Sequence, residues 1–501
     1  MNTLKKTLAL VATLSMAATA LASCGSQAAS SSSESSSDAV SDAASEVSDA
    51  VSDAVSDASE AVSDAVDAVT GTGEIDASVG KGGADFTVAA WNADDVPALL
   101  AQWKGESDYK AFADKLANDS VDGIKFINFG VPGGEASEKY DQLFAGGGDI
   151  DVYFCEADWA LKYINDDSLT LDLAKLGLGD SDFSNIFGYT DEIGKDKNGV
   201  RKGVSWQAAA GGFGYRADLA EEYLGVKSPA EMQDKIGDWD KFVEAAKTVN
   251  EASNGKTALA DTLGGIWQAY ACGRTQPWVK DNKLVIDDFC KDFADTAKAL
   301  WDCGGVTKNT QWSDDWTAAG TNGSCMGYFV STWGFGGFFL NAAGGVDGDT
   351  YGKWAVCEGP QAFYWGGTWI VVHPNTDNGE EARDFIISAT SDEDQMSAYA
   401  KTKPEFVNNS KVMADLIDAN TVFNEEITGN FKDKQNYFAE LAENAKTIDF
   451  NGLITEYDAT VKGEFIDAVQ KQYIEAGASW EDTLDAFKDQ VAEKITTLDI
   501  E

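Results

Sequence analysis

The sequence is poor in histidine, in basic residues and in long apolar runs. One histidine, His373, stands among 501 residues, and the cysteines form no Cys-x-x-Cys pair, so a structural zinc site is not expected. Lys and Arg number 38 against 84 Asp and Glu, a formal charge of −46. This charge argues against nucleic-acid binding, because phosphates would be repelled. Beyond residue 24 no apolar run approaches the roughly eighteen residues of a membrane-spanning helix.

Sequence signatures of enzymes are missing as well. Ser324, Ser331 and His373 form no nucleophilic constellation, and the Gly-x-Ser-x-Gly elbow is absent. Neither a P-loop nor a dinucleotide-binding fingerprint occurs. We therefore expect no cofactor, no metal and no enzymatic activity. A secreted glycoside hydrolase stays open as the alternative, because its two carboxyl groups need only be close in space.

The first residues have the pattern of an export signal. Lys5 and Lys6 precede an apolar run over residues 7–21, which is too short to span a membrane but typical of a secretory signal peptide. The run ends in Leu-Ala-Ser-Cys-Gly, which resembles the lipobox of bacterial lipoproteins. The resemblance implies a signal peptide over residues 1–23 and lipid attachment at Cys24. An ordinary secretory signal with an incidental Cys24 is the alternative.

A low-complexity segment follows over residues 24–83. It consists mainly of Ser, Ala, Asp and Val, and has twelve acidic residues between Ala28 and Asp76. With few large apolar groups to bury, it predicts an extended linker and no packed core. Its valines recur at spacings of three, four and seven, which also permits a transient helix.

Six cysteines remain beyond Cys24. An even number in an exported chain permits disulfides, but fifteen complete pairings are possible, and buried free thiols are the alternative. They are Cys155, Cys272, Cys290, Cys303, Cys325 and Cys357.

The remaining residues, about 420, exceed what one hydrophobic core usually serves, so two domains are expected. Predicted strands at 86–91, 123–129, 150–154 and 366–372 alternate with predicted helices, which indicates an α/β fold. Asp238 and Ser479 are predicted to cap two amphipathic helices.

Five segments then resemble, in order, the family 1 extracellular solute-binding proteins of the sugar-binding, maltose-binding-protein-like type. They carry the family's Tyr-x-x-Leu helix before "Pro-Asp-Val", its crossing strand, its "Thr-Trp-Asp-Glu-Phe" helix start, its "Gly-Lys-Ala-Ala-Met" with a later Gly-x-Trp, and its "Thr-Ser-Pro-Glu-x-Gln". The chain departs from the pattern at Ile150, Arg216 and Cys325, where the family has Pro, Asn and Ala. The matching segments are 140–152, 204–219, 238–242, 323–333 and 380–395.

The resemblance implies a two-lobe α/β fold of the type II periplasmic-binding-protein kind. Lobe 1 would comprise 84–207 and 364–406, and lobe 2 would comprise 208–363 and 407–501. Chain crossings are expected near Gln207, 360–363 and Val407. The implied function is capture of a small ligand, a mono- or oligosaccharide, for the membrane subunits of an ABC importer. The implied protein is a monomer, lipid-anchored to the outer face of the bacterial cytoplasmic membrane. Peptides, polyamines, metal complexes or a surface-adhesin role are the alternatives.

Fifteen tryptophans suggest how a sugar would be bound, since aromatic rings suit its flat C–H faces while Asp, Asn and Gln suit its hydroxyls. Several lie at predicted strand ends or in glycine-rich loops. Arg274 is expected to be solvated. The predicted ligand-binding residues are Trp91, Asn92, Asp158, Trp159, Trp206, Gln207, Trp267, Trp333 and Trp365.

Overall fold

The computed structural model describes residues 73–421, 423–450 and 453–500. All of them belong to the second of two units into which the chain divides, Val66–Glu501. The predicted signal peptide, Cys24 and the linker up to residue 72 lie outside the described residues. Within these ranges no helix combines the length and apolar character needed to cross a membrane.

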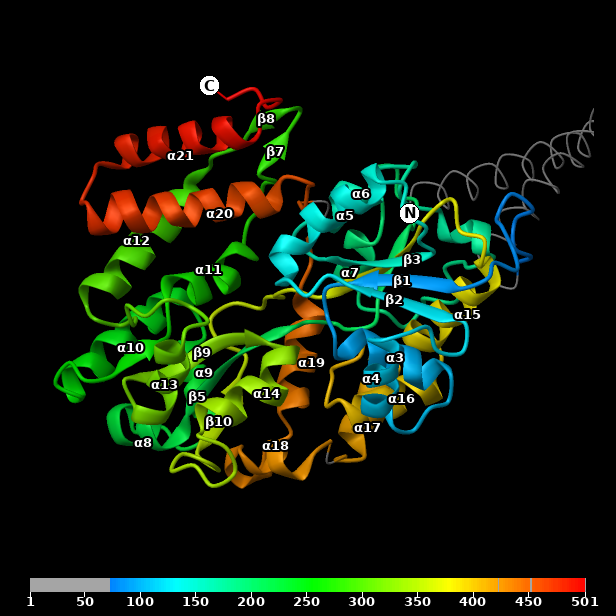
Figure 1. The fold of residues 1–501 in the computed structure, drawn as a ribbon. Coiled ribbons are helices and arrows are strands. Elements are labelled where there is room, and N and C mark those ends of the chain that lie inside the picture. Colours follow the sequence, from blue (N-terminus) through cyan, green and yellow to red (C-terminus); the bar gives the residue numbers. More distant parts are fainter. Residues whose placement is uncertain (1–72, 422, 451–452, 501) are drawn as a thin grey trace, which may run out of the picture. The chain divides into compact units, whose positions relative to one another are not determined.

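The first of two main sheets, here called sheet I, is mixed and has the strand order β2-β1-β3-β11-β4 (Figure 1). The strands β1, β2 and β3 are parallel, whereas β11 is antiparallel to both β3 and β4. Side chains of β1 and β11 are buried throughout, as expected for strands covered on both faces. The strands are β1 (Phe86–Ala90), β2 (Ile124–Asn128), β3 (Val152–Glu156), β4 (Gly203–Ser205) and β11 (Thr368–Val372).

We call sheet I with its associated helices lobe I. These helices are α3 (Asp95–Trp103), α4 (Tyr109–Leu116), η1 (Gly133–Glu135), α5 (Ala136–Ala145), α6 (Ala160–Ile164), η2 (Leu173–Leu176), α7 (Gly188–Ile193), α15 (Gly379–Thr390), α16 (Glu393–Thr402) and α17 (Ser410–Asp418).

The second sheet, sheet II, has the order β10-β5-β9-β6, with β6 parallel to β9 and the other pairs antiparallel. The strands are β5 (Gly211–Arg216), β6 (Ala258–Ala260), β9 (Cys325–Ser331) and β10 (Trp354–Cys357), and a separate hairpin consists of β7 (Val279–Lys280) and β8 (Lys283–Leu284).

Sheet II with its helices is called lobe II. The helices are α8 (Ala217–Leu224), α9 (Pro229–Ile236), α10 (Trp239–Ala252), α11 (Leu263–Ala271), α12 (Asp288–Asp302), α13 (Asp314–Asn322), α14 (Thr332–Ala342), α18 (Glu425–Gly429), η3 (Lys432–Lys434), α19 (Tyr437–Thr447), α20 (Asp458–Ala468), the π-helix η4 (Val469–Glu475) and α21 (Trp480–Lys494).

Three chain segments connect the two sheets side by side. Gln207 pairs with Val407 and Ala210 pairs with Tyr364 in isolated antiparallel bridges. These are the neighbourhoods in which the sequence predicts crossings. The strands β1, β2, β3, β4 and β11 form sheet I, and β5, β6, β9 and β10 form sheet II. The residue boundaries of the two lobes stay a prediction.

Local signals in the sequence agree well with the elements. The side chains of Asp238 and Ser479 accept hydrogen bonds from the backbone N–H of Lys241 and Asp482, so both predicted caps are confirmed. The predicted strand at 366–372 begins two residues later, because its two glycines form a turn.

The end of the predicted linker is packed on lobe I. Ile75 and Val79 are buried, and Gly80 O accepts a 3.0 Å hydrogen bond from Gly379 N at the start of α15. The folded part therefore begins before residue 84, where composition alone placed it, because two isolated apolar side chains suffice to hold this short stretch.

Close packing under aromatic rings generates a stability prediction. A methyl group on Gly214 of β5 would lie 2.1 Å from Cζ of Phe339, whereas one on Gly337, in the same helix as Phe339, would meet nothing within 4 Å. We expect Gly214→Ala to lower the free energy of unfolding by about 1–3 kcal/mol through overpacking. Gly337→Ala, the matched control, should leave it unchanged or raise it by up to about 1 kcal/mol, because alanine favours a helix. Urea denaturation measures both, and equal values would contradict the packing argument.

Candidate functional site

The parallel strands of sheet I end at one edge, where aromatic and acidic residues follow them. Trp91 comes directly after β1, and Asp158 lies two residues beyond Glu156, the last residue of β3. Because β1 and β3 are parallel neighbours, their carboxyl ends share an edge of the sheet. Ligands of open α/β sheets bind in the crevice outside this edge.

A glycine turn before β11 lies at the same edge. β11 is antiparallel to β3, so the beginning of β11 lies beside the end of β3. Gly366 and Gly367 have φ values of +72° and +99°, which favour glycine. A methyl group on Gly366 would lie 3.4 Å from Nε1 of Trp333 and 3.8 Å from Oε1 of Glu156. The turn thus separates a tryptophan of lobe II from a carboxyl group of lobe I.

Three tryptophans gather around this turn, and we call Trp312, Trp333 and Trp365 the tryptophan cluster. Their ring centroids are 5.5–5.6 Å apart, and Trp333 Nε1 donates a 2.8 Å hydrogen bond to the carbonyl of Trp365. Trp312 is 55% exposed although its ring is large and apolar. Its φ of +69° is unfavourable for a non-glycine residue, and strained positions of this kind are concentrated at functional sites.

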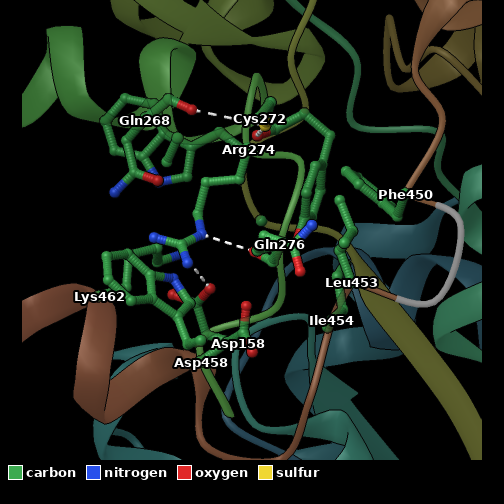
Figure 2. Close-up of a pocket in the computed structure, with 15 residues that line it drawn as sticks. Asp158, Gln268, Cys272, Arg274, Gln276, Phe450, Leu453, Ile454, Asp458 and Lys462 are labelled. Atoms are coloured by element: carbon green, nitrogen blue, oxygen red, sulfur yellow. Dashed lines mark hydrogen bonds and ion pairs between the residues drawn. The ribbon is translucent and has the colours of Figure 1, made fainter. Parts of the chain in front are cut away.

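A pocket lies beside the tryptophan cluster, and Trp365 belongs to both. Figure 2 shows the side chains that line the pocket. On the side of lobe I, its wall consists of Asp158 after β3 and of residues 364–366 before β11. On the side of lobe II, it consists of residues from α11 and the loop after it, and from α20 and the segment before it. The lining residues are Asp158, Gln268, Ala271, Cys272, Arg274, Gln276, Trp278, Tyr364, Trp365, Gly366, Phe450, Leu453, Ile454, Asp458 and Lys462.

An ion pair joins the two lobes at this pocket. Lys462 Nζ of α20 lies 2.5 Å from Oδ1 of Asp158, and the lysine side chain is 16% exposed. Burial opposes the charge of Lys462, but the interaction with Asp158 outweighs it and raises the lysine pKa. Burial raises the pKa of Asp458 to about 6, and burial together with Asp158 raises that of Glu156 to about 8. One ammonium group therefore has three carboxyl groups around it.

A further buried carboxyl group, Glu405, lies at the chain crossings. Gln207 Nε2 donates a 3.3 Å hydrogen bond to Oε2 of Glu405, and the hydroxyl of Thr368 in β11 donates a 3.0 Å hydrogen bond to Oε1 of Gln207. Burial, and secondarily the charge of Asp95, raises the pKa of Glu405 to about 8.

Arg274 corrects an expectation. The sequence suggested a solvated side chain, but the residue is only 8% exposed. Its guanidinium group stacks 3.6 Å over the ring of Trp278 and donates to the carbonyls of Gln276 and Pro277. It thereby fixes the loop after α11, which an arginine does well because its planar group both stacks and donates several hydrogen bonds.

Four of the predicted ligand-binding residues lie at this site, namely Trp91, Asp158, Trp333 and Trp365. Trp91 packs edge-on against Trp159, whose own indole is buried and donates to the carbonyl of Gly133 at 3.1 Å. Trp159 therefore supports Trp91 from behind.

The other four predicted residues take part in structural contacts and are not among the pocket-lining residues. Asn92 accepts hydrogen bonds from the backbone N–H groups that begin α3. Gln207 lies at the crossings. Trp206 packs on Phe154 and is 2% exposed, and Trp267 is 1% exposed within a lobe II core. A strand-end position alone does not separate such core tryptophans from exposed ones.

Sequence reasoning missed Trp312, Glu156 and Lys462. Trp312 stands in the polar stretch Asn-Thr-Gln-Trp-Ser, and an isolated indole among polar residues was a usable signal. Glu156 and Lys462 carried none, since they are two among many charged residues and are brought together only by the fold.

Among the described residues, no group of three or more His, Cys, Asp or Glu side chains could hold a metal ion. The six cysteines predicted either to pair or to stay free are all free. Cys272 lines the pocket, and burial raises its pKa to about 11, so it is a thiol at neutral pH.

The chain has two mixed sheets that are joined by crossing segments, and a pocket lies at the carboxyl ends of the parallel strands of sheet I. This arrangement defines the two-lobe binding-protein class, and solved structures confirm the fold. A crystal structure of a family 1 extracellular solute-binding protein is 18% identical, with a TM-score of 0.66, covering 83% of this chain and all of the other. A second structure is the galacto-N-biose/lacto-N-biose I-binding protein of a Bifidobacterium longum ABC transporter in complex with lacto-N-biose. It is 16% identical, with a TM-score of 0.62, and the match covers 84% of this chain and all of the other.

A third structure is the ABC transporter associated binding protein of B. animalis subsp. lactis Bl-04 in complex with β-1,6-galactobiose, with 18% identity, a TM-score of 0.60, and coverage of 84% and 100%. No curated protein matches in sequence. A family model described as "Bacterial extracellular solute-binding protein" matches residues 118–424, more than half of the chain. The chain belongs to this family, whose members bind solutes and are not enzymes.

The buried Glu405 generates a pH prediction. Its pKa in the folded state, about 8, lies above the ordinary glutamate value of 4.5. Between these values the unfolded chain releases the proton that the folded state keeps, so stability falls as pH rises. Because glutamine does not titrate, we expect Glu405→Gln to remove this part of the pH dependence, about 4 kcal/mol between pH 5 and pH 8.5. Urea denaturation at both pH values measures it. An identical pH dependence in wild type and variant would show that Glu405 does not titrate in this way.

Proposed function

We propose that this protein captures a mono- or oligosaccharide between its two lobes and delivers it to an ABC importer. The observation that carries the proposal is the tryptophan cluster beside a pocket whose lining comes from both lobes. Small-molecule sites are concave and mostly apolar, with a few polar groups that fix orientation. Sugars fit this description because their C–H faces stack on aromatic rings.

The exposed indole of Trp312 favours a saccharide over a purely polar solute. Exposed aromatic side chains at a pocket commonly mark a contact surface. Two of the similar structures hold disaccharides, lacto-N-biose and β-1,6-galactobiose, which supports the ligand class at low sequence identity. Trp91, Trp312, Trp333 and Trp365 would stack on the sugar, and the ligand would favour lobe closure by contacting both lobes.

A cationic solute such as a polyamine is the second candidate. The three carboxyl groups around Lys462 favour it, since they outnumber the ammonium group. The proposed lobes are 84–207 with 364–406 and 208–363 with 407–501, except that the stretch around Ile75 and Val79 and helix α17 are assigned to lobe I. A monomeric state and delivery to importer membrane subunits complete the proposal.

The decisive experiment is a thermal-shift screen of the chain from Gly25 onward against monosaccharides, lacto-N-biose, β-1,6-galactobiose and spermidine. A ligand that binds only the folded state raises the melting temperature, by an amount that grows with its concentration. A saccharide should raise it and be recovered unchanged. Cleavage of the sugar would establish the glycoside hydrolase instead, and a shift with spermidine alone would establish the second candidate.

Removing the proposed stacking surface should weaken binding more than folding. We expect Trp333→Ala to reduce saccharide affinity by about 2 kcal/mol or more, as for a central aromatic anchor. Trp312→Ala should weaken binding with little loss of stability, because its ring is largely exposed. Trp480→Ala, at the start of α21 and outside the pocket lining, is the control. Calorimetry measures the affinities, and values equal to the control would remove these indoles from the site.

The proposed lipid anchor has a separate test. Cys24→Ala should prevent acylation, and the protein should move from the membrane fraction of the expressing bacterium to its soluble export fraction, because stable anchoring requires acyl chains. Fractionation and mass measurement of the N-terminus follow both effects. Unchanged membrane retention without acylation at Cys24 would contradict the anchor.

A further inference from the structure

Glu156, the last residue of β3, lies beside Gly366, which lines the pocket, although Glu156 is not itself among the lining residues. A methyl group on Gly366 would lie 3.8 Å from its Oε1, and one on Gly133 would lie 3.6 Å from its Cγ and 3.0 Å from Nε1 of Trp91. The same point on Gly366 is 3.4 Å from Nε1 of Trp333. The carboxyl group therefore lies among two glycine turns and the indoles of both lobes.

Two carboxyl groups line the pocket itself, and both take part in structural contacts. Asp158 forms the ion pair with Lys462. Oδ1 of Asp458 accepts hydrogen bonds from both the backbone N–H and the hydroxyl of Thr455 at 2.8 and 2.7 Å, which fixes the start of α20. In Glu156, Oε2 accepts a 2.8 Å hydrogen bond from Asp158 N, which orients the carboxyl group and leaves Oε1 as the oxygen nearer the Gly366 turn.

We propose that Glu156 is the specificity-determining residue of this site, and that its carboxyl group exchanges hydrogen bonds with hydroxyl groups of an uncharged saccharide stacked on the tryptophans. This inference rests on the proposed function and narrows its ligand class to neutral sugars. A hydroxyl both donates and accepts, and so does a carboxylic acid, whereas a carboxylate only accepts.

The charged and titratable groups facing Glu156 agree with this assignment. They are Asp158 from the loop after β3, Lys462 from α20, Cys155 from β3 itself and Tyr364 from the crossing before β11. Burial and Asp158 raise the pKa of Glu156 to about 8, and Lys462 opposes this only in part. The group is then protonated at neutral pH. A cationic solute would instead bind more tightly as Glu156 loses its proton.

The test combines two variants with a control outside the pocket lining. Glu156→Gln keeps the shape and both donor and acceptor without titrating, Glu156→Ala removes them, and Glu440→Gln on α19 is the control. Tryptophan fluorescence of the protein alone is titrated from pH 6 to 10. Calorimetry then measures lacto-N-biose, β-1,6-galactobiose and spermidine at pH 7 and 9.

In wild type and Glu440→Gln, we expect a fluorescence transition near pH 8, because Trp91 and Trp333 lie beside the carboxyl group of Glu156. Both Glu156 variants should lack this transition. Disaccharide affinity should fall about tenfold from pH 7 to 9 in wild type, because one proton must be kept, and should stay constant in Glu156→Gln. Glu156→Ala should bind at least about tenfold more weakly at pH 7, as expected when a buried partner is lost.

Each other result overturns the inference in a recognisable way. A disaccharide that binds wild type and Glu156→Ala equally shows that Glu156 does not contact the ligand. A pH dependence that persists in Glu156→Gln assigns the titration to another group. Spermidine binding that strengthens at pH 9 and is lost in Glu156→Gln replaces the neutral ligand by a cationic one. Failure of all three probes to bind wild type rejects the proposed saccharide function itself and removes the basis of the inference.

Discussion

Backbone pairing at the chain crossings is the constraint on which the site depends. Buried peptide groups must be hydrogen-bonded, and here Ala208 N donates to Phe406 O while Gly211 N donates to Phe363 O, at 3.1 and 2.7 Å. The paired segments run antiparallel between the two sheets, so the edge of sheet I that carries Glu156 adjoins the end of β9, which Trp333 of α14 follows. The same pairing explains why Trp206 is a core residue, since its neighbours in sequence are used to join the sheets.

The large negative charge of the chain says little about the ligand, because each carboxyl group near the site is either paired, hydrogen-bonded or has a raised pKa. Asp158 is paired with a lysine, Asp458 is hydrogen-bonded, and burial raises the pKa of Glu156 and Glu405. Burying an ionised carboxylate without a partner is far more unfavourable than protonating it. The pocket is therefore much closer to neutral than the surface, which is compatible with an uncharged solute in a protein of formal charge −46.

The sequence predicted what depends on local patterns. Strand β1, the caps at Asp238 and Ser479 and the helix α21 all follow from hydrophobic periodicity and side-chain-to-backbone bonds within a few residues. It could not distinguish Trp267 from Trp333, because each lies in a helix, α11 and α14, and only tertiary packing decides which indole is covered. The strained backbone that exposes Trp312 is likewise invisible in sequence, since a positive φ at a non-glycine residue is imposed by its surroundings.

The ion pair between Lys462 and Asp158 determines which contacts between the lobes a ligand has to add. It joins α20 of lobe II to the loop after β3, and it is made from the protein's own side chains. A ligand shifts a conformational equilibrium only by its difference in affinity for the two states. A saccharide therefore need not supply the charge–charge contact between the lobes. In the proposed complex, its contribution to closure would lie in contacts made with both lobes at once, those of Trp333 and Trp312 on one side and those of Trp91 and Glu156 on the other.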